Sequence, residues 1–130
     1  MINLRSLSLL SCLGIALTAP PGGYPLKRTQ YWFTVPIDHF ASNGNSPTFQ
    51  IRYFVDAEYW DPQTGPIIFY AGNEGRAEGF WDNSGFMTDV MGPQLKGLLV
   101  LGEHRYFGDS FPYSQDKAFL PGYNQYLTVD

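Results

Sequence analysis

The chain has 130 residues, a formal net charge of −4 and one cysteine, and 44% of its residues are hydrophobic. This length is sufficient for one domain with its own hydrophobic core. The acidic balance excludes a protein that binds nucleic acid through a basic surface, and one cysteine excludes a small domain held together by internal disulfides.

The first 18 residues are predicted to be a signal peptide. Arg5 precedes an apolar stretch that extends to Leu17 and is too short, with its interruptions, to span a bilayer. Small residues at the required spacing allow cleavage after Ala16 or after Thr18. A lipoprotein anchor at Cys12 is the less favoured alternative, because the apolar segment before it is short. We therefore expect an exported protein whose mature part is residues 19–130.

The next elements predict an antiparallel hairpin. Gln30–Val35 is rich in β-forming residues, and Ala41–Pro47 carries enough turn formers to reverse the chain. Thr48–Val55 alternates between apolar and polar residues as far as Tyr53, which is the period of a strand with one solvated face. The apolar positions are Phe49, Ile51, Tyr53 and Val55, and the positions predicted to face solvent are Thr48, Gln50 and Arg52.

A strand, a helix and a second strand are predicted to follow. Pro66–Ala71 and Leu98–Leu101 are apolar without alternation, which favours strands of a parallel sheet that are covered on both faces. Between them, Phe80–Gly97 has apolar residues spaced loosely like one face of a helix, although Gly85, Gly92 and Pro93 interrupt it. Such βαβ units are almost always right-handed. The predicted fold class is thus α/β, with an antiparallel hairpin followed by a βαβ unit.

Polar loops follow both predicted parallel strands. The first strand leads into GNEG at Gly72–Gly75, and the second into the ionisable and aromatic residues Glu103, His104, Arg105 and Tyr106. Ligands in open α/β sheets gather beyond the carboxyl ends of the strands. The residues of these two loops are therefore the candidates for a functional site.

The motifs in this order resemble the start of the proline-directed serine peptidases that include lysosomal Pro-X carboxypeptidase and dipeptidyl peptidase II. The resemblance extends from about Tyr31 to Asp130, and its strongest elements are GNEG and EHRYFG. Further matching elements are Asp38-His39-Phe40, Thr48-Phe49, Arg52-Tyr53, Tyr59-Trp60, Asn83 and Gly85-Phe86. The sequence departs from the family pattern at Ile51 and at Val35–Ile37, which lie outside the two strand-end loops.

The resemblance implies an α/β-hydrolase fold with a Ser, Asp, His triad in a secreted or lysosomal enzyme. The nucleophile elbow of that fold reads G-x-S-x-G, and the sequence contains no such pattern around Ser84, Ser110 or Ser114. No catalytic residue is therefore assigned. Residues 19–130 are expected to be the N-terminal part of an α/β-hydrolase peptidase domain with an incomplete sheet, truncated before the nucleophile strand.

The same resemblance implies that Gly72, Asn73, Glu74 and Gly75 form an oxyanion loop, since one donor of the oxyanion hole follows the third strand of this fold. The alternative is that the two glycines only permit a tight strand-to-helix turn. Glu74 could bind the free amino terminus of a substrate, or it could pair within the fold, which is favoured.

Three further interpretations concern the second loop. Arg105 is predicted to pair with Glu74 or Glu103. His104 could move protons near neutral pH, but a hydrogen-bonded structural role is favoured. A metal site built on Asp38-His39 and Glu103-His104 is not expected, because adjacent side chains on a strand point to opposite faces.

Two functions remain open at this level. The first is the N-terminal part of a secreted or lysosomal serine exopeptidase that cleaves next to proline, inactive by itself and without a cofactor. Its partner would be a peptide substrate with proline near the scissile bond, and homo-oligomers stay possible, whereas nucleic acid and a membrane span are not expected. Carboxypeptidase and dipeptidyl peptidase specificity are not distinguished. The second is a non-catalytic secreted binding module.

Overall fold

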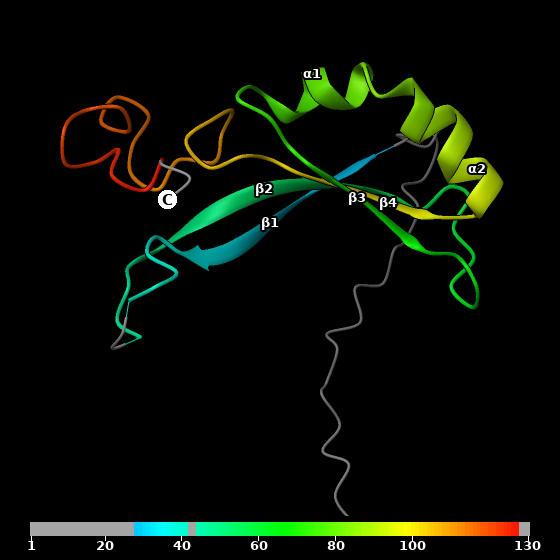
Figure 1. Ribbon diagram of the computed structural model, residues 1–130, viewed down its shortest axis with the longest axis horizontal. Helices are drawn as coiled ribbons and strands as arrows, with labels where there is room; N and C mark the ends of the chain where they lie inside the picture. Colours follow the sequence, from blue (N-terminus) through cyan, green and yellow to red (C-terminus); the bar gives the residue numbers. More distant parts are fainter. Residues whose placement is uncertain (1–27, 42–43, 128–130) are drawn as a thin grey trace, which may run out of the picture.

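The computed structural model describes residues 28–41 and 44–127, and the predicted signal peptide lies outside them. The elements in chain order are β1 (Thr29–Pro36), β2 (Thr48–Asp56), β3 (Ile67–Ala71), α1 (Ala77–Asp82), the π-helix η1 (Phe86–Met91), α2 (Gly92–Leu95) and β4 (Leu98–Gly102). The strands form one four-stranded sheet in the order β1-β2-β4-β3 (Figure 1). The fold class is mixed α/β, as predicted.

Strands β1 and β2 form the predicted antiparallel hairpin. Tyr31 lies opposite Tyr53, and their rings stack with centroids 5.4 Å apart. The N–H of Ile37 donates to the carbonyl oxygen of Pro47 at 2.8 Å, which closes the connection between the strands. The prediction from turn formers and alternation is therefore confirmed.

Strands β3 and β4 pair in parallel, with Ile67 opposite Leu98. The helical connection between them is divided into three short segments, as the interrupting residues predict. Pro93 stands in the first turn of α2, where its missing N–H is not needed, and Lys96 ends α2 in a left-handed conformation at φ 49°. No helix in residues 28–41 and 44–127 is long and apolar enough to cross a membrane.

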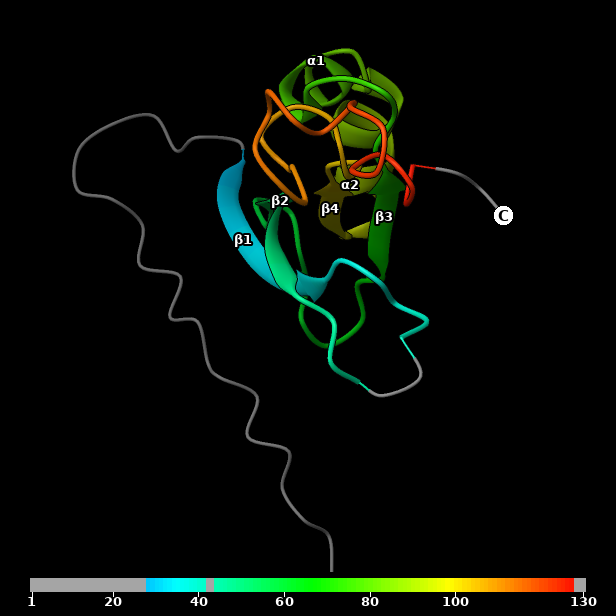
Figure 2. The ribbon, with the colours of Figure 1, turned by 90° about the vertical axis from the view of Figure 1, so that its left-hand side faces the viewer.

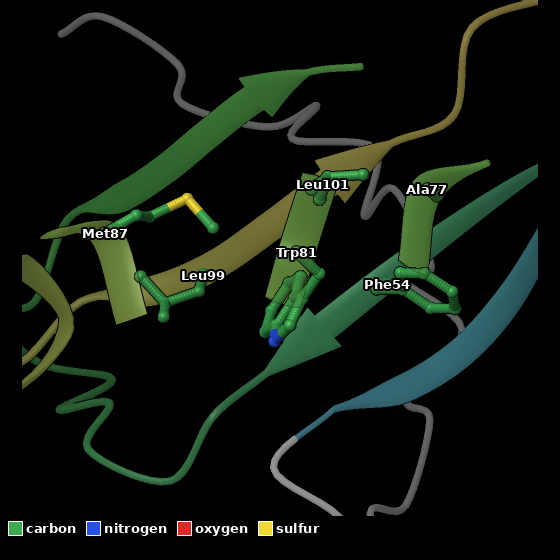
Figure 3. Close-up of a cluster of buried hydrophobic side chains, with 6 residues drawn as sticks. All are labelled: Phe54, Ala77, Trp81, Met87, Leu99 and Leu101. Atoms are coloured by element: carbon green, nitrogen blue, oxygen red, sulfur yellow. The ribbon is translucent and has the colours of Figure 1, made fainter. Parts of the chain in front are cut away.

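The helices cover one face of the sheet (Figure 2). Six buried side chains from both layers form the core between them: Phe54, Ala77, Trp81, Met87, Leu99 and Leu101 (Figure 3). The rings of Phe54 and Trp81 meet edge to face with centroids 6.2 Å apart, a geometry that adds to simple area burial. This core anchors the start of α1, and with it the loop that joins β3 to α1.

The other face of the sheet is partly exposed in the described residues. Ile67 and Phe69 of β3 are 68% and 63% exposed to solvent. They are exposed because α1 and α2 lie on the opposite face and β3 is at the edge of the sheet. The expectation that both parallel strands are covered on both faces is therefore wrong for β3 in this part of the chain.

The predicted solvated face of β2 is confirmed at Thr48 and Gln50, which are exposed, and is wrong at Arg52. Arg52 is only 2% exposed, and it lies on the same side of β2 as the core residue Phe54, two positions further along. The side predicted to face solvent therefore turns toward α1 from Arg52 onward. A buried arginine requires compensating charge, and the candidate site supplies it.

Candidate functional site

The loops after β3 and β4 leave the sheet at the same end (Figure 1). The N–H of Gly72 donates to the carbonyl oxygen of Gly102 at 2.8 Å, which extends the parallel pairing by one step. A Cβ at position 72 would lie 2.4 Å from that oxygen. Glycine is needed here because the two chains approach closely, and the predicted convergence of the two loops is present.

Glu103 lies at the centre of these loops, with a side chain that is 0% exposed. Its carboxylate accepts five hydrogen bonds, from Arg52 Nε at 3.2 Å, Arg52 Nη2 at 2.5 Å, Ala77 N at 3.0 Å, Asp109 N at 2.9 Å and Ser110 Oγ at 2.7 Å. These donors come from β2, from the start of α1 and from the segment after β4. One buried carboxylate thus joins three segments that are distant in sequence.

Arg52 extends this network to the surface. Its two terminal nitrogens bond both carboxylate oxygens of Glu78 at 2.7 and 2.8 Å, and Nη1 forms an ion pair with Asp109 at 2.8 Å. Burial disfavours the guanidinium charge, but the hydrogen bonds to Glu103 and Glu78 outweigh it and raise the pKa of Arg52. The guanidinium therefore stays charged and holds three carboxylates.

A second arginine joins the same two loops from outside. Arg76, at the end of the loop after β3, bonds both oxygens of Asp109 at 3.1 Å and contacts Glu78 at 3.3 Å. Hydrogen bonding to Asp109 is the main cause that raises the pKa of Arg76. Its side chain is 60% exposed, so this contact stabilises less than the buried pair.

The turn around Gly108 packs directly on the buried carboxylate. Gly108 has φ of 59°, and a Cβ there would lie 1.8 Å from Glu103 Oε1. Two residues later, the hydroxyl of Ser110 accepts the backbone N–H of Arg52 at 2.9 Å and donates to the Glu103 carboxylate. The loop after β4 is therefore shaped around Glu103.

The GNEG loop has two engaged and two unengaged N–H groups. The N–H of Gly72 is bonded to Gly102, and the N–H of Gly75 donates to the carbonyl of Asn73 at 2.8 Å. Within the described part of the chain, the backbone N–H groups of Asn73 and Glu74 have no acceptor. The Asn73 side chain donates to the hydroxyl of Tyr70 at 3.0 Å. Asn73 and Glu74 are thus the backbone donors that remain available to a ligand.

The predicted ion pairs of Arg105 are wrong. Its guanidinium donates to the carbonyl oxygens of Ile37 at 2.8 Å and Pro36 at 3.2 Å, and it lies 5.3 Å from the ring centroid of Phe49. Glu103 pairs with Arg52 instead. Glu74 is exposed and forms no ion pair with any described residue, so the favoured internal role of its carboxylate finds no support.

His104 and Tyr106 point into different surroundings. The His104 Nδ1 lies 2.7 Å from the carbonyl oxygen of Arg105, and its ring meets Phe107 edge to face. Tyr106 is 0% exposed, has φ of 70°, and donates its hydroxyl to the carbonyl of Tyr123 at 2.8 Å. Burial raises the pKa of Tyr106. Both residues support the loop, and the His104 contact fits the structural role that was favoured.

The serines of this region are engaged in local hydrogen bonds. Ser84 Oγ donates to the carbonyl of Phe80 at 2.6 Å, and Ser110 is buried against Glu103. No serine bonds a histidine within residues 28–41 and 44–127. The same part of the chain contains no cluster of three side chains suited to a metal ion.

A cavity of about 580 Å³ lies elsewhere, and residues of β2, α1, η1 and α2 are among those that line it. Its walls include Arg28, Asp56, Trp81 and Asp82, and none of the candidate loop residues lines it. Arg28 and Asp82 form an ion pair in that wall. We place the candidate site at the strand-end loops, because the unengaged backbone donors are there.

Several residues of the network were not identified from sequence as site residues: Arg52, Glu78, Asp109 and Ser110. Only Arg52 carried a signal, as a charged residue on the same strand face as Phe54. Glu78 and Asp109 look like ordinary surface acids in the sequence. Their participation depends on contacts between distant segments.

Comparison with known proteins identifies relatives for most of this region. A family model described as serine carboxypeptidase S28 matches residues 35–120. Lysosomal Pro-X carboxypeptidase of Mus musculus is 40% identical over 117 residues, which are 88% of this chain and 23% of the relative. The Homo sapiens protein of that name is 41% identical over 114 residues, 85% of this chain and 22% of the relative.

A more distant animal provides a third relative. Prolyl carboxy peptidase like protein 5 of Caenorhabditis elegans is 41% identical over 90 residues, 69% of this chain and 17% of the relative. The chain therefore spans less than a quarter of the length of these curated relatives. The resemblance inferred from GNEG and EHRYFG is confirmed.

Proposed function

Because the chain belongs to the serine carboxypeptidase S28 family, we propose that it provides the oxyanion loop of a serine exopeptidase with an α/β-hydrolase fold. The substrate would be a peptide with proline near the scissile bond, as the names of the relatives indicate for those proteins. The observation that carries the proposal is the pair of N–H groups of Asn73 and Glu74, which have no acceptor at the carboxyl end of β3.

The proposed chemistry is acyl transfer through an acyl-enzyme. A serine activated by histidine attacks the peptide carbonyl, and negative charge develops on the carbonyl oxygen. In α/β-hydrolases, one N–H for this oxygen comes from the residue after the nucleophile and another from the loop after the third strand. Residues 72–75 supply the second donor, and the nucleophile, acid and base come from outside the described residues.

Glu74 has a separate role in this proposal. A carboxylate next to a developing oxyanion is unfavourable unless it serves another purpose, and Glu74 is exposed with no partner in the described residues. We propose that it attracts the free amino group of an unblocked peptide. This interaction would be made in the ground state, and it would therefore act on substrate affinity rather than on the chemical step.

A chimera tests the function. Residues 28–127 replace the matching segment of human lysosomal Pro-X carboxypeptidase, to which the chain is 41% identical. We expect the chimera to fold and to hydrolyse an N-blocked peptide that ends in Pro-Phe. A folded chimera that hydrolyses no such peptide, beside an active parent enzyme, would overturn the proposal and favour the non-catalytic binding module.

Two further variants of the chimera test the donors themselves. Asn73→Pro and Glu74→Pro each remove one backbone N–H, and neither position has a positive φ that would exclude proline. Loss of the oxyanion donor lowers kcat by about 10²–10³-fold. The control is Asp82→Asn, which removes the surface pair with Arg28. If both proline variants keep kcat within about twofold of the chimera, less than ~0.5 kcal/mol, the loop donates to no oxyanion.

Export is proposed on the predicted signal peptide and on the lysosomal names of four relatives. Expression of the natural chain in a eukaryotic secretory host should give a processed protein. Sequencing of its amino terminus should begin at Leu17 or Ala19, the residues after the two predicted cleavage positions. A protein that keeps Met1 and stays in the cytoplasm would contradict this proposal.

A further inference from the structure

Two consecutive residues at the end of β4 hold both ends of the GNEG loop. The carbonyl oxygen of Gly102 accepts the N–H of Gly72 at 2.8 Å, and the carboxylate of Glu103 accepts the N–H of Ala77 at 3.0 Å. Only residues 73–76 lie between these two anchors. The available N–H groups of Asn73 and Glu74 are therefore presented by a short span whose ends cannot move independently of β4.

The anchor at Ala77 is itself rigidly placed. Glu103 is fully buried and receives donors on both oxygens, including two bonds from Arg52. Ala77 is also 0% exposed and belongs to the hydrophobic core. A side chain locked in this way holds its hydrogen-bonding partner in one place, as preorganised sites require.

We propose that Glu103 is a positioning residue for the oxyanion donors of this protein, acting through its hydrogen bond to the Ala77 N–H. This inference rests on the proposed function. Glu103 touches no reacting atom. The residue that it holds, Ala77, follows the donors Asn73 and Glu74 along the chain. Its effect is geometric, because a donor displaced by a fraction of an ångström stabilises the transition state less.

A second role of Glu103 must be separated from this one. Its pair with Arg52 also stabilises the fold, and loss of that pair would leave a buried guanidinium. A variant that removes the bond to Ala77 and keeps the Arg52–Glu103 pair is therefore required. Ala77→Pro does this, because position 77 is the first residue of α1, where proline is tolerated. Arg76 before it has φ of −68° and ψ of 134°, a conformation that a following proline accepts. Since the ring also adds volume at a fully buried position, Ala77→Val, which adds volume and keeps the N–H, is measured beside it.

The experiment compares Ala77→Pro and Glu103→Gln in the chimera with the Asp82→Asn control. We expect both variants to lower kcat at least tenfold with KM within about twofold, since the displaced loop donors act in the transition state. Glu103→Asp, which keeps the charge but is shorter, should restore part of kcat. Ala77→Pro with kcat within twofold of the chimera would overturn the proposal, even if Glu103→Gln lowers the melting temperature.

Amide hydrogen exchange provides a readout that does not depend on activity. We expect the peptide that covers residues 72–77 to exchange at least tenfold faster in Glu103→Gln than in the unsubstituted chimera. Unchanged exchange in a folded variant contradicts the positioning role. If the unsubstituted chimera is inactive but this exchange difference is present, the proposed function fails and the anchoring of the loop stands.

Discussion

Gly72 and Gly102 lie so close together that the N–H of the first donates to the carbonyl of the second at 2.8 Å, and no side chain fits between them. This contact joins β3 and β4 where their loops begin. It explains the first glycine of GNEG by close approach of two backbones rather than by a left-handed conformation. The backbone N–H groups of the next two residues, Asn73 and Glu74, have no acceptor in the described residues.

Replacing Gly72 by valine in the chimera should therefore separate the two loops. A Cβ at this position would lie 2.4 Å from the Gly102 oxygen, so β3 and β4 must move apart. We expect kcat to fall by about tenfold or more while KM stays nearly unchanged, because the displaced donors act in the transition state. A kcat within about twofold of the chimera, less than ~0.5 kcal/mol, would show that this loop is only a turn.

Gly108 offers a test of the packing around Glu103. Gly108→Ala places a methyl group 1.8 Å from the Glu103 carboxylate at a φ of 59°. Gly122→Ala is the matched control, since its φ is 85° and its Cβ would meet no atom within 4 Å. A left-handed backbone alone costs an alanine about 1–2 kcal/mol, and this cost is shared by both variants. We expect Gly108→Ala to lose ~1 kcal/mol or more of unfolding free energy beyond the loss in the control. Equal losses in a thermal melt would contradict the clash.

Glu78 makes the stability of the site dependent on pH. Burial alone would raise its pKa, but the hydrogen bonds from Arg52 outweigh that effect, and the net pKa lies below its ordinary value of 4.5. Because the pKa of Glu78 is lower in the folded chain than in the unfolded chain, its ionised carboxylate stabilises the fold at pH above 4.5. This stabilisation is lost as the pH falls through the lower pKa of the folded state. We expect Glu78→Gln to destabilise the chimera near neutral pH and to matter progressively less below pH 4.5. Melting temperatures of both proteins across this range provide the measurement, and a difference that grows on acidification would contradict the assignment.

Glu74→Gln tests the proposed recognition of an amino group. Because Glu74 is exposed and has no partner in the described residues, we expect an unchanged melting temperature. The KM for a peptide with a free amino terminus should rise about fivefold, equivalent to ~1 kcal/mol for an exposed ion pair. The same peptide with a blocked amino terminus should be unaffected. Equal changes for both peptides, or a loss of stability, would contradict the proposed role.

The sequence predicted the elements better than the side-chain contacts. The hairpin depends on alternation in β2 and on turn formers before it, which are local signals. The burial of Arg52 depends on Glu78 and Glu103, which lie 26 and 51 residues away in sequence. The position of Arg52 on the strand face of Phe54 is a local signal, but nothing local identifies the two acids that compensate its charge.

The same limit applies to the candidate site. The motif EHRYFG identified Glu103 as a residue of interest, but the partner predicted for Arg105 was wrong because its real acceptors are the carbonyls of Pro36 and Ile37. Backbone carbonyls carry no sequence signature. The two N–H groups without acceptors could likewise be found only once Gly72 and Gly75 were seen to donate elsewhere.

The exposed sheet face gives the last prediction. Ile67 and Phe69 stand on the face of β3 opposite the helices, and the parallel edge of β3 has no further strand in the described residues. An apolar surface next to an open sheet edge favours association. The 130-residue chain alone is therefore expected to bind a hydrophobic dye and to melt without a cooperative transition. Replacing both residues by threonine should reduce the dye binding, whereas threonine at buried Leu99 should increase it. A monomer with a sharp, reversible melt and no dye binding would show that this sheet is stable without further cover.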